Sequence, residues 1–220
     1  MNRFQLYRQG WSKEEKINTL THLLPLIGTF FAAWYLLRLS LDCGGLAVIG
    51  TVLFLFGMVV MFASSTIYHA VTNPVCKARL RVFDHISIYV MIAGSYSLIC
   101  MCVVGGRAGW FLFVFLWTCV LVGTAGKLIA LGKYPRLSLL LYLAMGWVAL
   151  FVIRPMWLHM PHAAFWWILA EGVFYTAGTY FFNGDEQHAR WHAIWHVFTT
   201  LGAMSHTIAT WLILADIAAG

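Results

Sequence analysis

The feature of this sequence that most restricts its fold is a series of seven apolar runs separated by short polar connections. Each run is close to the roughly 20 residues that an α-helix needs to cross the hydrocarbon layer of a membrane. The runs lie at residues 17–39, 46–70, 83–104, 110–131, 137–153, 164–182 and 191–215. The connections between them are rich in glycine, proline and asparagine, which are typical of turns. The pattern predicts an all-α, seven-transmembrane helix bundle.

The composition supports a membrane protein. Charged residues make up only 10% of the chain and hydrophobic residues 61%, whereas a soluble domain carries about 25% charged residues. This excludes an ordinary soluble domain. The net charge of +6 therefore does not indicate nucleic-acid binding, because basic residues in such a chain orient its loops against the membrane. The expected partner is membrane lipid, and no nucleic acid is expected.

The basic residues predict how the bundle is oriented. We expect a cytoplasmic N-terminal segment, residues 1–16, followed by the seven-helix transmembrane domain, residues 17–219. Eleven of the fourteen Lys and Arg residues fall in the N-terminal segment and in the second, fourth and sixth connections. The other three, Arg38, Arg107 and Arg154, fall on the opposite side. Basic residues mark the cytoplasmic side, so the N-terminus is predicted to be cytoplasmic and the C-terminus outside.

A pair of histidines opens the last apolar run. His192 and His196 are four residues apart, so they share one face of a helix, as two metal ligands on a single helix do. His188 precedes them by one more turn, which makes His188 with His192 an alternative pair. His188 lies beside Asp185 and Glu186 in the expected loop, whereas His192 and His196 lie deeper in the membrane. This difference in depth favours His192 and His196 as the pair of metal ligands. The alternative to any ligand role is that these histidines lie in the headgroup layer.

Two upstream residues reach the same depth in the membrane. His69 lies at the end of the second run and Asp84 at the start of the third. At 1.5 Å of rise per residue, His69, Asp84 and the histidine pair all lie about 3 to 10 Å inside the cytoplasmic boundary. Ser65 is four residues before His69, on the same helix face. The sequence therefore predicts that three helices bring these groups into one layer, with Asp84 as its only carboxylate.

Three imidazoles and a water molecule form a common catalytic zinc site with an open fourth position. Zinc also suits imidazole ligands in a chain whose cysteines are not clustered. The predicted ligands are His69, His192 and His196. Asp84 is then placed to act as a hydrogen-bond acceptor or as the general base, and Ser65 to bind water or substrate. The alternative for Asp84 is an ion pair with an arginine at the interface, Arg79 or Arg81.

Three further ionisable residues lie in or beside apolar runs. His22 starts the first run and is predicted either to contact the site or its substrate, or to be an interfacial histidine. His206 lies ten residues beyond the histidine pair, where packing or a place in a substrate cavity is expected. Glu171 is predicted only to make a polar contact inside the bundle. A haem held by two histidines is a further alternative, although axial histidines usually lie deeper in the bilayer.

Several motifs together resemble a known family. They are Ser65-Thr-Ile-Tyr-His69, Phe83-Asp84-His85, Tyr142-Leu-Ala-Met-Gly-Trp147, His192-Ala-Ile-Trp-His196, and Glu14-Glu15-x-x-Asn18-x-x-Thr21-His22 before the first run. The chain resembles, over essentially its whole length, the haemolysin III branch of the progestin and adipoQ receptor family. The resemblance implies seven transmembrane helices with the N-terminus inside. It also implies zinc bound by His69, His192 and His196, with Asp84 near the bound water, and a relation to alkaline ceramidases.

Two classes of function follow from these observations. The first is a zinc-dependent, ceramidase-like hydrolase of lipid amide or ester bonds that acts in membrane homeostasis, as a multi-pass protein of the bacterial inner membrane. The second is a non-enzymatic sensor or regulator of membrane state, or a haemolysin-like channel, with a structural zinc. An open fourth coordination position within reach of Asp84 favours the hydrolase. A fourth protein ligand favours the structural site.

Overall fold

The computed structural model describes residues 12–130, 135–185 and 187–220, and within these ranges the chain is almost entirely helical and contains no strand. The all-α prediction is confirmed. The α-helices are α2 (Lys13–Ser40), α3 (Gly45–Ala70), α4 (Pro74–Leu98), α5 (Gly106–Ala130), α6 (Pro135–Gly146), α7 (Ile153–His159), α8 (His162–Gly184) and α9 (Trp191–Ala219). The short helices η1 (Leu41–Cys43), η2 (Ile99–Val104) and η3 (Trp147–Val152) extend or join them. Because η3 runs from α6 directly into α7, the described residues form seven long helical segments.

Six of these segments are long and apolar enough to cross a membrane, which makes the chain a multi-pass membrane protein. The seventh, α8, has 23 residues, which is also sufficient length, but it is not among the six. The helix α8 contains Glu171 and several aromatic residues with polar atoms, such as Trp166 and Tyr175. These residues lower the mean hydropathy of α8 although its length is that of its neighbours.

Several helices begin before their predicted apolar runs, and α4 does so by the widest margin. α4 begins at Pro74 rather than at residue 83, because the Asn73 side chain accepts hydrogen bonds from the backbone N–H groups of Val75 and Cys76. Such a cap followed by proline at the first helical position is a strong start signal. Hydropathy alone does not reveal this helix start, because the first turns of α4 contain charged residues such as Lys77. The run predicted at 137–153 similarly continues to His159.

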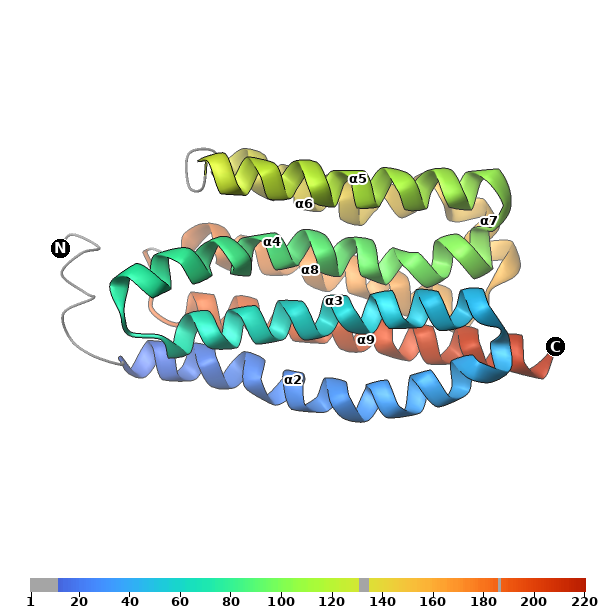
Figure 1. Ribbon diagram of the computed structural model, residues 1–220, viewed down its shortest axis with the longest axis horizontal. Coiled ribbons are helices and arrows are strands. Elements are labelled where there is room, and N and C mark those ends of the chain that lie inside the picture. The colour runs from blue at the N-terminus through green and yellow to red at the C-terminus, as the bar shows by residue number, and fades with distance from the viewer. Residues whose placement is uncertain (1–11, 131–134, 186) are drawn as a thin grey trace.

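The helices run nearly parallel to the long axis of the molecule (Figure 1). α2, α3 and α9 lie together on one side, α4 and α8 in the middle, and α5 with α6 on the other side. The start of α2, the α3–α4 turn and the α8–α9 turn meet at one end of the bundle (Figure 1). The first turns of α2 and α4, which carry Lys13, Lys16, Lys77, Arg79 and Arg81, therefore lie at that end, which we call the basic end. The basic residues at positions 3, 8 and 133 lie outside the described residues.

α3 and α4 pack closely because glycines line their contact. A methyl group on Gly94 would lie 2.6 Å from the carbonyl oxygen of Leu53, and one on Gly50 would lie 2.6 Å from the Cα atom of Leu98. Small residues let the backbones of membrane helices approach in this way. These glycines lie in the first half of α3 and near the end of α4, so the two helices stay in contact far from the short turn that joins them beside the candidate site.

Candidate metal centre

His69 lies in the last turn of α3 with 3% of its surface exposed. Its Nδ1 atom is 2.7 Å from Oε2 of Glu15, in the first turn of α2. The Nζ atom of Lys77 is 3.1 Å from the same carboxylate oxygen. Lys77 also donates to the carbonyl oxygens of Tyr68 and Val71, at 2.9 and 3.3 Å. A lysine at a helix C-terminus stabilises its last carbonyls, so Lys77 ties the end of α3 to Glu15.

His192 lies in the first turn of α9. The preceding cap residue, Arg190, has a φ of 68°, and it is the one residue other than glycine with a positive φ in the described part of the chain. This left-handed turn leads the chain from α8 into α9. The Nδ1 atom of His192 is 2.6 Å from Oδ2 of Asp185, which directly follows α8. The second ring is therefore held by a carboxylate as well.

His196 lies one turn further along α9 and is 2% exposed. Its Nδ1 atom is 2.9 Å from the Thr21 hydroxyl and 3.2 Å from the backbone carbonyl oxygen of Asn18. Both partners belong to α2. α2 therefore supplies the groups that orient His196 and, through Glu15, His69.

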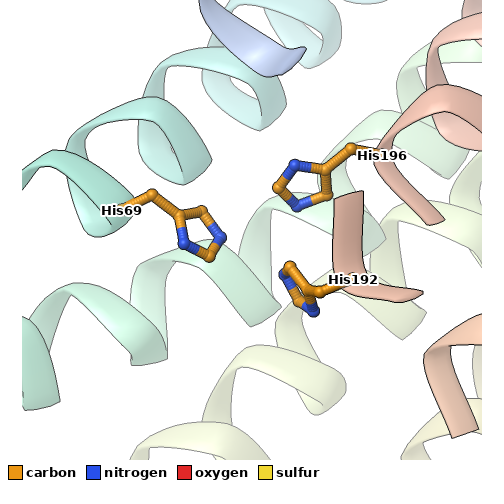
Figure 2. A group of neighbouring side chains, drawn as sticks. All are labelled: His69, His192 and His196. Carbon is orange, nitrogen blue, oxygen red and sulfur yellow. The ribbon is translucent and has the colours of Figure 1, made fainter. Parts of the chain in front are cut away.

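Figure 2 shows the three imidazole rings of His69, His192 and His196 pointing toward one another from α3 and α9. One ring nitrogen of each lies within 4.8 Å of the corresponding atoms of the other two. The ring centroids are 4.6 to 5.1 Å apart. The ring planes are inclined to one another by 58° to 70°, so the rings do not stack. The cluster can hold a metal ion.

The hydrogen bonds around the cluster match what a metal site requires. In each ring the Nδ1 atom contacts an outer partner, a carboxylate for His69 and His192 and a carbonyl with a hydroxyl for His196. Metal-binding histidines commonly donate their second N–H group to such partners, which fixes the ring and its tautomer. The Nε2 atom of His192 is buried and makes no hydrogen bond within the described residues. The residues present therefore fit a metal ion that takes imidazole ligands.

The cluster lines a cavity of about 930 Å³, and the wall of this cavity includes Thr72 of the α3–α4 turn and His188 of the α8–α9 turn, at the basic end of the bundle. Asp84 and Ser65 line the same cavity, as the sequence predicts. The Asp84 carboxylate interacts electrostatically with His69 and His192, and the Ser65 hydroxyl is its hydrogen-bond partner. Among the residues that the structure describes, no ion pair joins this carboxylate to an arginine. The carboxylate also interacts with Arg81, but less strongly than with His69 and His192.

His22 forms part of the wall of the cluster. Its ring stacks on the ring of His196 with 3.6 Å between centroids and an angle of 15° between planes. Its Nε2 atom is 3.1 Å from the Thr199 hydroxyl, and the residue is 4% exposed. This supports the prediction that His22 contacts the site and not the interface. It is not one of the three clustered residues.

Two other predicted residues lie away from the cluster. His188 stacks on Trp191, with 4.0 Å between ring centroids, and is exposed. It does not belong to the three clustered histidines, so the alternative pair of His188 with His192 is not the one that the fold assembles. His206 instead pairs with Glu171 deeper in the bundle, at 2.6 Å.

The expectation that Asp84 is the only carboxylate at this depth is wrong. Glu15 contacts His69, and Asp185 contacts His192. Both carboxylates lie outside the predicted apolar runs, in segments expected to be outside the membrane. The signal for Glu15 is a polar face on α2, because Glu15, Asn18 and His22 are spaced three and four residues apart. Asp185 has no comparable signal, since its position depends on the turn before α9. Glu186 lies outside the described residues.

The chain resembles known proteins over most of its length. The model of the haemolysin-III related family matches residues 10–207. The chain is 30% identical over 192 residues to the Hemolysin-3 homolog of Bacillus subtilis (strain 168), which covers 87% of this chain and 90% of that protein. It is 29% identical to Hemolysin-3 of Bacillus cereus over 192 residues, 87% of each chain. It is 28% identical to the human monocyte to macrophage differentiation factor over 205 residues, 90% of this chain and 83% of that protein. The chain belongs to the haemolysin-III related family.

Proposed function

We propose that this chain is a seven-span protein of the bacterial inner membrane, with α8 as the seventh span, its N-terminus in the cytoplasm and its C-terminus outside. Three observations support the arrangement. α8 is as long as a membrane span and packs against α9. The first turns of α2 and α4, which carry Lys13, Lys16, Lys77, Arg79 and Arg81, meet at one end of the bundle, which the positive-inside rule assigns to the cytoplasm. Two of the relatives come from Bacillus species.

We propose further that His69, His192 and His196 hold a zinc ion. The observation that carries this proposal is that the Nδ1 atom of every ring is held by an outer partner. The remaining nitrogens then converge, and three imidazoles without a thiolate are a donor set that zinc accepts. Because the cluster has three members among the described residues, a fourth coordination position is left for water or substrate. This arrangement is typical of catalytic zinc sites.

The reaction that the site suits is hydrolysis of a lipid amide or ester bond. A zinc ion held by His69, His192 and His196 would lower the pKa of a bound water molecule to about 7 and would polarise a carbonyl group. Asp84 lies in the same cavity, where its carboxylate accepts a proton from the attacking water and returns it to the leaving group. Ser65 orients that carboxylate through a hydrogen bond. Glu15 and Asp185 keep the rings of His69 and His192 in place.

The substrate enters from the membrane in this proposal. A second, largely apolar cavity adjoins the metal cavity inside the bundle, and residues such as Met61 and Trp195 line both. An acyl chain fits an apolar cavity of this kind, while the polar end of the lipid stays in the wider cavity at the basic end. The carbonyl between these two parts then lies near the three histidines.

The test compares the wild type with Asp84→Asn in lipid nanodiscs. Zinc content is measured by mass spectrometry, and hydrolysis is measured on a panel of acyl amides and esters that includes ceramides. Asp84→Asn is expected to keep its zinc, since the three histidines remain, and to lose hydrolysis by about 10² to 10⁴-fold. The matched control is Asp42→Asn, which removes an exposed carboxylate at the opposite end of the bundle and should retain both. Hydrolysis at the wild-type rate in Asp84→Asn would disprove the role of Asp84.

A second candidate is a non-enzymatic membrane protein, a regulator or a haemolysin-like channel, with a structural zinc. The observation that favours it is the name of the relative from Bacillus cereus, Hemolysin-3. The same measurements separate the two candidates. Stoichiometric zinc in a wild-type protein that hydrolyses no member of the panel, but releases dye from vesicles, would favour the second.

A further inference from the structure

A second buried ionisable pair lies deep in the bundle, away from the metal cluster. The Nδ1 atom of His206 on α9 is 2.6 Å from Oε2 of Glu171 on α8, and their side chains are 2% and 12% exposed. His206 is ten residues beyond His196 on the same helix, which places it roughly 15 Å deeper. Ionisable residues inside a membrane bundle are costly, and they usually serve a function. The proposed hydrolysis does not use this pair.

The pair lines the apolar cavity beside the metal site. This cavity has a volume of about 130 Å³ and is bounded by α3, α4, α6, α7, α8 and α9. Most of its lining is aliphatic or aromatic, and among the described residues that line it Glu171 is the one acidic side chain and His206 the one basic side chain. It shares six lining residues with the metal cavity, namely Met61, Ile88, Leu139, Phe182, Trp195 and Thr199. A chain that begins at the metal cluster and extends inward therefore reaches Glu171 and His206.

Tyr175 adds a hydrogen-bond donor to the same cavity. It follows Glu171 by four residues, so the two side chains lie on one face of α8, and both line the cavity. Its hydroxyl is buried and has no hydrogen-bond partner within the described residues. Its ring packs against Gly202 of α9, where an added methyl group would lie 2.8 Å from the ring. The ring is thus held in place while its hydroxyl is left to bind something else.

We propose that Glu171, His206 and Tyr175 form a binding site for a hydroxyl group on the apolar chain of the lipid substrate. This inference rests on the proposed function, which places the polar end of that lipid at the metal cluster. The carboxylate accepts a hydrogen bond and the phenol donates one, and a hydroxyl group both donates and accepts. An anionic group on the lipid chain would be repelled by the Glu171 carboxylate, so the site selects a neutral group. The substrate class is an acyl lipid with a hydroxylated chain.

The test is equilibrium binding of two probes to the zinc-loaded protein in nanodiscs. The probes are octadecanoic acid and the same acid with one mid-chain hydroxyl group. The wild type is expected to bind the hydroxylated acid about five- to ten-fold more tightly, the worth of one net hydrogen bond. Tyr175→Phe keeps the ring against Gly202 and should bring the two affinities together without weakening the binding of octadecanoic acid. The matched control, Tyr180→Phe, removes a hydroxyl from an exposed tyrosine of α8 and should keep the preference.

Two results would overturn this inference, namely equal affinities in the wild type or an undiminished preference in Tyr175→Phe. The measurement does not depend on turnover, so it is separate from the test of the proposed function. A hydroxyl preference in a protein that hydrolyses nothing supports this site while the hydrolase proposal fails. Hydrolysis of acyl lipids by a protein without the preference removes this site and leaves the hydrolase proposal standing.

Discussion

Glu15 and His69 are 54 residues apart in the chain, yet the carboxylate oxygen Oε2 of one lies 2.7 Å from the ring nitrogen Nδ1 of the other. This contact joins the first turn of α2 to the last turn of α3. Lys77, which bonds to the same oxygen, adds the first turns of α4. A single carboxylate thus joins three helices at the level of the candidate metal centre, and it fixes the orientation of the His69 ring.

Replacing Glu15 with glutamine should weaken metal binding without abolishing it. The glutamine keeps the size of the side chain but loses the charge that holds the His69 ring and raises its basicity. Loss of such an outer partner typically costs about 10 to 100-fold in metal affinity. Zinc affinity measured by competition with a chelator should therefore fall by this factor in Glu15→Gln. The neighbouring Glu14 is exposed, so Glu14→Gln is the control, and equal affinities in all three proteins would contradict the role of Glu15.

The sequence predicts the cluster itself because depth in a membrane can be counted along each helix. His69 and Asp84 flank one connection, and His192 and His196 follow another on the same side of the membrane. With a constant rise per residue, short connections leave little freedom in the level at which these side chains lie. The same argument separates His206 from the cluster, and the structure confirms that separation.

The outer partners were not predictable in the same way, because hydropathy marks where a helix is apolar and not where it begins. α2 and α4 start before their apolar runs, so the charged residues Glu15 and Lys77 lie on helices rather than in loops. Asp185 reaches His192 only because the left-handed conformation of Arg190 turns the chain there. The partnership of Glu171 with His206 depends on how α8 and α9 are rotated, which no spacing along either helix determines.

The orientation predicts where reporters fused to the chain are active. With seven spans and a cytoplasmic N-terminus, alkaline phosphatase fused after Gly220 should be active and a fluorescent protein fused there should be dark. Fusions in the α7–α8 turn, after His159, should also report the outside, and fusions after Gly184 the cytoplasm. The pair of fusions around α8 tests whether this helix spans the membrane. Fluorescence at the C-terminus together with phosphatase activity after Gly184 would show that the bundle is inverted.

The contact between α3 and α4 should depend on Gly94. Alanine there places a methyl group 2.6 Å from the carbonyl oxygen of Leu53, so the two helices must separate. Overpacking of this kind typically costs about 1 to 3 kcal/mol in the free energy of unfolding. Gly94→Ala should therefore unfold at a lower temperature in the same nanodisc. Gly28→Ala on α2 is the control, because nothing lies within 4 Å of the added methyl, and alanine favours a helix interior over glycine.

Metal removal should destabilise the basic end of the bundle, because the ligands lie on α3 and α9 and their outer partners on α2. A ligand that binds only the folded state stabilises it by about 2.7 kcal/mol at a concentration 100 times its dissociation constant. Chelator-treated wild type should therefore gain thermal stability when zinc is added. Alanine variants of His69, His192 or His196 should lose most of their zinc and most of this gain.

His188→Ala and His206→Ala are the matched controls for this experiment. His188 lies in the turn before α9 and His206 lies on α9, and removing either histidine leaves the cluster intact. Both should keep stoichiometric zinc and the full thermal response. The double variant His192→Ala with His196→Ala removes both α9 ligands and leaves a single histidine on α3, which cannot hold the ion in a closed site. Stoichiometric zinc in that double variant, with its thermal response intact, would place the metal somewhere else in the chain.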